Sequence, residues 1–291
     1  MRKSWLTWML FVLMIATALA PAEAQRRGGG GRRGAKQTKA TPTPAAGEAP
    51  AEAPPPESAP AAKPPAPKDS ALIAMEPHLL AYAIGPARDA LGRFSDPQSA
   101  GALVGEGRVL TLEQQYSAAV TRFDRAAEAA PDDPAPLVYK GEAQLYARQD
   151  AAARQSLAAG KERAQARLDR SADDSESWLL LGIAQRHLGE LDAAYASLER
   201  ARALAGGDER VLYEMGATRY VQQRWQPAID LLTQAIGINP RVAYAYYLRG
   251  VAASQSNRKD LTVNDLGRFL ELAPTAPVAE RARKVLASLQ G

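Results

Sequence analysis

Few residues in this chain have the types and the spacing that catalysis or metal binding requires. Its two histidines, His78 and His187, lie far apart in the sequence and have no partners at ligand spacing, so neither a zinc site nor a histidine-based triad is indicated. No cysteine is present to form a disulfide or a metal thiolate. The nucleophile-elbow and phosphate-loop motifs are absent, and the glycine run at 28–31 has no helix to complete a phosphate cradle. We therefore predict that the protein is not an enzyme and holds no cofactor or metal.

The elements that position the functional residues are indicated by five regularly spaced glycines. Gly107, Gly141, Gly182, Gly216 and Gly250 are separated by 34, 41, 34 and 34 residues. A period of this length predicts stacked copies of one supersecondary unit. Large apolar residues precede each glycine, and an Ala-x3-Leu/Phe-x2-Ala spacing after most of them puts apolar side chains on one helical face. Each unit is therefore expected to be a pair of closely packed helices.

These units resemble the tetratricopeptide repeat. The closest match is the stretch Trp178-Leu179-Leu180-Leu181-Gly182, which follows the W-x2-L-G start of that pattern. The resemblance covers roughly residues 100–275. It implies an all-α, right-handed α-solenoid of about five helical hairpins, at 100–133, 134–174, 175–208, 209–242 and 243–275.

The second unit departs from the pattern. Gly160 stands where alanine is expected, and Gln165 stands where a proline would stop the helix. The helix is therefore predicted to continue through 161–170, with Ala164 and Leu168 on its apolar face. The extra length is nearly two helical turns, so that face keeps its phase.

Both ends of the array are predicted to carry caps. Residues 276–291 form an amphipathic segment suited to a C-terminal capping helix. Residues 70–99 are expected to form an N-terminal helical cap, with breaks near Pro77 and at Gly85-Pro86, but they do not match a full repeat. Acidic pairs such as Asp132-Asp133 and Asp173-Asp174 fall between units, where helix capping is the expected role.

The amino-terminal quarter has a different composition. Residues 1–24 combine a basic start, an apolar run and an Ala-x-Ala site, which predicts an export signal. An uncleaved anchor is the alternative, because the arginines that follow oppose translocation. Residues 25–69 are rich first in Arg and Gly, then in Ala and Pro, and are expected to be a disordered linker. The localisation expected is exported, periplasmic or secreted, or held at the membrane by an uncleaved segment.

The basic residues of this linker are a second candidate interaction site. They are Arg26, Arg27, Arg32, Arg33, Lys36 and Lys39. An anionic envelope surface, nucleic acid or a solvated linker without a partner are the three interpretations. Nucleic acid is disfavoured because no aromatic residue interleaves with these charges. Residues 71–291 carry 26 Lys and Arg against 27 Asp and Glu, so the repeats add no basic surface.

The resemblance also implies where a partner would dock. In tetratricopeptide arrays the first helix of each unit lines a concave groove that receives partner peptides. The positions that match are Arg108, Val138, Glu142, Tyr146, Leu179, Ile183, Arg186, His187, Arg210, Tyr213, Tyr220, Tyr244 and Tyr247. The groove candidates among them are Tyr146, Arg186, His187, Arg210, Tyr213, Tyr220, Tyr244 and Tyr247. Several of the tyrosines could instead be packing residues, as Tyr246, Trp178 and Trp225 are expected to be.

The function predicted is a non-catalytic protein-interaction scaffold of the bacterial cell envelope. The alternatives are a protein that acts on nucleic acid or an anionic surface through its basic tail, and an accessory subunit of an envelope enzyme. The asparagine-and-lysine arrangement by which chaperone-binding members hold a C-terminal carboxylate is absent at matching positions, so that ligand is not implied.

Overall fold

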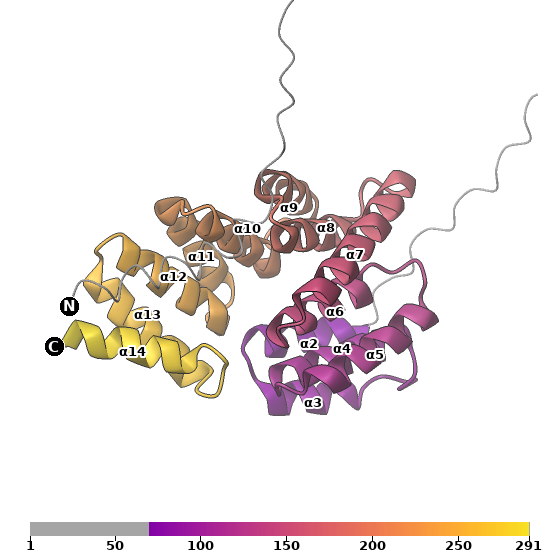
Figure 1. Cartoon of the computed structure of the whole chain (residues 1–291), viewed down its shortest axis with the longest axis horizontal. Coiled ribbons are helices and arrows are strands. Elements are labelled where there is room, and N and C mark those ends of the chain that lie inside the picture. The colour runs from indigo at the N-terminus through magenta and orange to yellow at the C-terminus, as the bar shows by residue number, and fades with distance from the viewer. Residues whose placement is uncertain (1–69, 291) are drawn as a thin grey trace, which may run out of the picture. The chain divides into compact units, whose positions relative to one another are not determined.

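The computed structural model describes residues 70–290, and these contain helices and no strands. The predictions for residues 1–69 therefore lie outside the described residues. The helices, labelled as in Figure 1, are α2 (Ser70–Leu80), α3 (Ile84–Leu91), α4 (Ala100–Leu112), α5 (Tyr116–Ala129), α6 (Ala135–Tyr146), α7 (Asp150–Arg170), α8 (Ser175–Leu188), α9 (Leu191–Ala205), α10 (Glu209–Val221), α11 (Trp225–Ile238), α12 (Ala243–Gln255), α13 (Lys259–Leu272) and α14 (Ala279–Gln290). None of these helices has the length and apolarity needed to cross a membrane.

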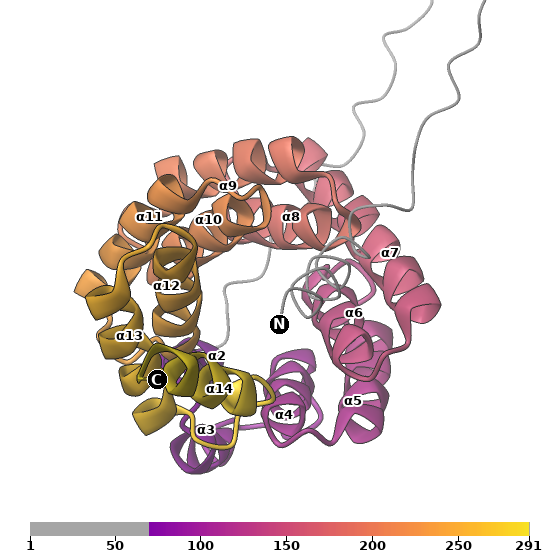
Figure 2. The same cartoon turned by 60° about the vertical axis from the view of Figure 1, so that its left-hand side comes forward.

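Consecutive helices pack as antiparallel pairs, and the pairs stack on one another. The pairs are α4–α5, α6–α7, α8–α9, α10–α11 and α12–α13, with α14 after the last. Figure 2 shows the first helix of each pair on the inner side of the stack and the second helix on the outer side. The predicted all-α solenoid of five hairpins with a C-terminal capping helix is confirmed for this part of the chain.

The spaced glycines are where the two helices of a pair touch. A Cβ atom at Gly107 would lie 2.6 Å from a ring carbon of Phe123, and one at Gly141 would lie 2.5 Å from Leu157. Gly182 and Gly216 meet the equivalent leucines of their second helices in the same way. Real Cβ contacts are essentially never this short, so a larger residue at these positions would displace the facing Phe or Leu side chain. The regular spacing of these glycines therefore reflects a close helix–helix contact that recurs in successive repeats.

The helices of each pair are joined by a turn that contains one residue in the left-handed conformation. These residues follow the spaced glycines by seven positions: Gln114 (φ 62°), Arg148 (φ 61°), Gly189 (φ 85°), Gln223 (φ 59°) and Asn257 (φ 57°). Tyr82, with φ 55°, has the same place between α2 and α3, and Met75 stands seven residues before it. The N-terminal cap is thus a sixth hairpin, with methionine in place of the glycine.

The break expected near Pro77 does not occur. α2 continues through Pro77 to Leu80, and Pro86 lies in the first turn of α3, where its missing N–H costs no helical hydrogen bond. The connection falls instead at 81–83.

The lengthened helix of the second unit is present as predicted. α7 has 21 residues and ends at Arg170. Ala164 and Leu168 on its extension are buried with Leu181 of α8. Gly160 fits because a Cβ there would lie 2.8 Å from Val138. The acidic turns act as caps, since Asp174 accepts hydrogen bonds from the first backbone N–H groups of α8.

The first and last helices of the described unit come into contact, and we call this contact the seam. The side chains of Leu80 and Tyr82 join core clusters built from α11, α12 and α13, whose buried members include Leu232, Val242, Ala243, Ala245, Tyr247 and Phe269. Gln114, after α4, donates a hydrogen bond to the carbonyl oxygen of Thr275 at 3.1 Å. The inner helices therefore surround a partly enclosed surface.

Candidate binding surface on the inner helices

Two charged networks and one group of tyrosines occupy the inner surface. The first, the Arg186 network, joins α6, α8 and α10. The Arg186 guanidinium lies 2.8 Å from a carboxylate oxygen of Glu214 and 3.9 Å from Glu142, and His187 Nε2 is 2.8 Å from Glu142 Oε1. Two of the predicted groove residues, Arg186 and His187, thus bind carboxylates of neighbouring repeats.

The pKa values of the two carboxyl groups in the Arg186 network are shifted in opposite directions. Burial raises the pKa of Glu214 above its ordinary value, and the nearby Arg186 offsets only part of this. Burial also tends to raise the pKa of Glu142. The hydrogen bond with His187 and the nearby positive charges together outweigh this effect, so the pKa of Glu142 is lowered.

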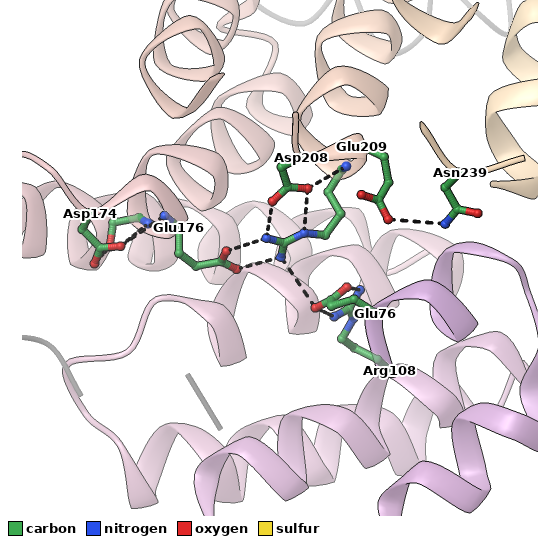
Figure 3. A network of polar contacts seen from close by, with 9 residues as sticks. Glu76, Arg108, Asp174, Glu176, Asp208, Glu209 and Asn239 are labelled. Carbon is green, nitrogen blue, oxygen red and sulfur yellow. Dashed lines mark hydrogen bonds and ion pairs between the residues drawn. The ribbon is translucent and has the colours of Figure 1, made fainter. Parts of the chain in front are cut away.

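The second network, the Arg210 network, joins α2 and α4 to α8 and α10 (Figure 3). Arg210 at the start of α10 lies 2.6 Å from Asp208, 3.1 Å from Glu176 of α8 and 3.6 Å from Glu76 of α2. Glu76 is buried, and its two oxygens also accept hydrogen bonds from Arg108 of α4 at 2.5 and 3.0 Å. Arg210, another predicted groove residue, is therefore engaged by three carboxylates.

Four tyrosines from separate elements line a pocket beside the seam. Tyr82, Tyr116, Tyr146 and Tyr244 form it together with Thr111, Leu112 and Pro277, and we call it the tyrosine pocket. The rings of Tyr116 and Tyr146 stack with centroids 6.1 Å apart, and those of Tyr82 and Tyr244 lie 6.2 Å apart. Tyr146 is 50 % exposed.

The hydroxyl groups of this pocket differ in their partners. The Tyr82 hydroxyl donates to the carbonyl oxygen of Leu112 at 2.7 Å. Those of Tyr116, Tyr146 and Tyr244 have no hydrogen-bond partner within residues 70–290. Three donors are thus available to a ligand.

The remaining candidates are packing residues to different degrees. Tyr213 is half-buried against the main core, and Tyr220 packs edge-on to Trp225 with centroids 5.6 Å apart. Tyr247 is only 6 % exposed and lies 5.1 Å from Phe269, so it belongs to the core and not to an accessible surface. The physical reason is that α13, α14 and the seam cover this part of α12.

Trp178, Trp225 and Tyr246 also pack against core clusters, as expected. The Tyr246 hydroxyl in addition donates a hydrogen bond to the carbonyl oxygen of Pro240 at 3.2 Å. Sequence reasoning missed Glu76, Tyr82 and Glu214. For Tyr82 a signal existed, because it follows Met75 by the same seven residues that separate the other turns from their glycines. In residues 70–290 no three His, Asp or Glu side chains are grouped to hold a metal ion.

The stacked pairs, their tight glycine contacts and their repeated turns define an α-solenoid of helical hairpins, and the fold is that of tetratricopeptide-repeat proteins. A crystal structure of TTC0263, a thermophilic TPR protein of Thermus thermophilus, matches 66 % of this chain and 99 % of its own length with a TM-score of 0.52 and 19 % identity.

Two further solved structures show weaker likeness. YrrB, described as a TPR protein with an unusual peptide-binding site, matches 70 % of this chain and 99 % of its own length at 17 % identity, with a TM-score of 0.40. MamA (residue 41 to the end) from Desulfovibrio magneticus RS-1 matches 60 % of this chain and 94 % of its own length at 15 % identity, also with a TM-score of 0.40. A scan of protein-family models finds no match to the sequence, and a search of curated proteins finds none either.

Proposed function

We propose that the protein is a non-catalytic scaffold that binds a partner protein or peptide on its inner surface. The observation that carries this proposal is the tyrosine pocket, where Tyr146 is half exposed and three hydroxyls have no hydrogen-bond partner among residues 70–290. The neighbouring charges, in contrast, are paired within the chain. Tyrosine combines apolar contact area with a polar tip and is frequent where binding energy concentrates. The solenoid fold supports the proposal, because it offers an extended surface and not a deep catalytic pocket.

Capture of partners from a cell-envelope extract tests this proposal. We expect Tyr146→Ala to lose the partners that the unchanged protein retains, because it removes the most exposed aromatic side chain of the pocket. Tyr246→Ala is the matched control, since Tyr246 lies on α12 outside the tyrosine pocket. If Tyr146→Ala captures every partner while circular dichroism shows an intact fold, binding on this surface is refuted.

We further propose that the protein acts in the cell envelope. The support is the composition of residues 1–24, with its basic start, apolar run and Ala-x-Ala site. Amino-terminal sequencing of the mature protein is expected to begin at Gln25, and fractionation should place it outside the cytoplasm. A start at Met1 in a membrane fraction would identify an uncleaved anchor, and a full-length cytosolic pool would refute the envelope proposal.

The basic tail supports a second, auxiliary contact. Its six cations, Arg26, Arg27, Arg32, Arg33, Lys36 and Lys39, with no acidic residue among them, suit an anionic envelope surface. Replacing all six with serine should release the protein from vesicles containing anionic lipid while partner capture by the repeats persists.

A further inference from the structure

In both charged networks the carboxylates outnumber the arginines. In the Arg186 network one arginine meets two carboxylates, those of Glu142 and Glu214. In the Arg210 network two arginines, Arg108 and Arg210, meet three carboxylates. Before His187 is counted, the Arg186 network keeps one surplus negative charge. This surplus is local, because the first helices of the five pairs together carry six Lys or Arg side chains and five Asp or Glu side chains.

This negative field reaches the tyrosine pocket. Glu142 and Tyr146 are four residues apart on α6, so their side chains share one helical face. Desolvation by the surrounding helices raises the pKa of Tyr146, and the charges of Glu142 and Glu214 raise it further, against the opposing effect of Arg186. Burial and the charge of Glu214 also raise the pKa of Tyr213, against the opposing effect of Arg186. A positive charge placed there would meet a favourable potential.

The aromatic rings favour the same kind of ligand. The face of a tyrosine ring attracts ammonium and guanidinium groups, and cages of several aromatic rings are a recurring way to hold them. The pocket brings together four tyrosine rings from the α2–α3 turn, α5, α6 and α12. Within this fold the pairing of arginine with a tyrosine face already occurs, since Arg108 lies 4.4 Å from the ring centre of Tyr139.

We propose that the tyrosine pocket, with the adjacent Glu142 and Glu214, is a docking site for a lysine or arginine side chain of the partner. The inference rests on the proposed scaffold function and names the chemistry of its partner as a basic peptide. An acidic peptide would meet the carboxylates of Glu142 and Glu214. A purely apolar one would cover the hydroxyls of Tyr116, Tyr146 and Tyr244, which have no hydrogen-bond partner within residues 70–290, without bonding them.

The test uses the full chain and a hexalysine peptide, titrated by calorimetry. We expect saturable binding that weakens with added salt and that Tyr146→Ala reduces about tenfold, in the range of a desolvated cation–π contact. Tyr146→Phe keeps the ring and should lose no more than about threefold. Hexaglutamate should not bind, and Tyr246→Ala should bind hexalysine normally. Because the chain has a net positive charge, general attraction to hexalysine does not explain this result.

Several outcomes overturn the inference. They are no saturable hexalysine binding, equal binding of hexaglutamate, or equal losses in Tyr146→Ala and Tyr246→Ala. If envelope partners depend on Tyr146 but hexalysine does not bind, the scaffold function stands and the basic-peptide inference is wrong. If hexalysine binds through Tyr146 but envelope partners do not depend on that residue, the cation site stands and the proposed function fails.

Discussion

Two kinds of polar surface lie side by side on the inner helices, and they differ in how their polar atoms are satisfied. In the Arg186 and Arg210 networks every charged group is engaged by side chains of neighbouring repeats. In the tyrosine pocket three hydroxyl groups are left without partners in the described chain. The difference indicates a division of tasks, in which the networks fix how adjacent repeats sit and the pocket remains available to a ligand.

Burial explains why the charged groups must be paired. A buried charge without a partner is strongly destabilising, whereas a complete pair is close to neutral in its net contribution. Arg186 and Glu214 are therefore expected to specify the geometry of the repeats more than to add stability. A tyrosine hydroxyl that still reaches water carries no such penalty.

The largest effect is expected when Arg186 is removed. Arg186→Ala leaves the buried Glu214 carboxylate without its arginine partner, which should cost about 3–5 kcal/mol of unfolding free energy. Urea denaturation measures this change. The exposed pair Arg268–Glu271 supplies the control, and Arg268→Ala should leave the midpoint unchanged. A loss in Arg186→Ala no larger than that of the control would show that the network is not structural.

Glu76→Gln should have a smaller effect, located at the seam. The substitution keeps the shape of the side chain but removes the negative charge between Arg108 and Arg210, at a cost of about 1–3 kcal/mol. Hydrogen exchange should become faster at the amides of α2 and stay unchanged in α8 and α9. Uniform acceleration in all these helices would mean that Glu76 acts on global stability and not on the seam.

The stability contributed by buried tyrosines is expected to be lost at alkaline pH. Burial raises the pKa of Tyr82 and of Tyr247 to about 12, against an ordinary value of 10. Both groups resist ionisation in the folded state, so their contribution to stability is complete below pH 10 and is lost as the pH rises towards 12. Tyrosinate absorbance and thermal melts across this range measure the effect, and Tyr82→Phe should reduce it. Complete ionisation near an ordinary tyrosine pKa in a folded protein would contradict this prediction.

The smallest change in stability is expected at Tyr146, where binding should change most. Tyr146→Ala loses its stacking on Tyr116, at a cost of about 0.5–1 kcal/mol, because half of the side chain is already exposed. Thermal melting compared with partner capture separates the two effects. A loss of stability as large as that of Arg186→Ala would show that the pocket, like the networks, is structural.

Much of the fold could be predicted because its main contacts are local. The spaced glycines indicate the five hairpins, and the in-phase extension of α7 follows from the missing proline at Gln165. The α2–α3 hairpin escaped prediction because Met75 replaces the marker glycine and Pro77 suggests a break that the helix does not make.

The functional surface was less predictable, because it depends on contacts between distant segments. A repeat pattern indicates which positions of each first helix face inward, and these include Tyr146, Arg186 and Arg210. It does not indicate that the seam brings Glu76 to Arg210, or that the last repeat buries Tyr247. Those facts follow from the curvature accumulated over the whole array, which no single repeat encodes.

The hairpin turns offer separate sites for engineering. Five of the six left-handed turn residues are not glycine, and this conformation costs a residue with a Cβ atom about 1–2 kcal/mol. Glycine at Gln114, Arg148 or Gln223 would relieve that strain, while its greater freedom in the unfolded chain offsets part of the gain. Since Arg148 and Gln223 lie outside the tyrosine pocket and both charged networks, individual repeats could be stiffened or loosened there without redesign of the binding surface.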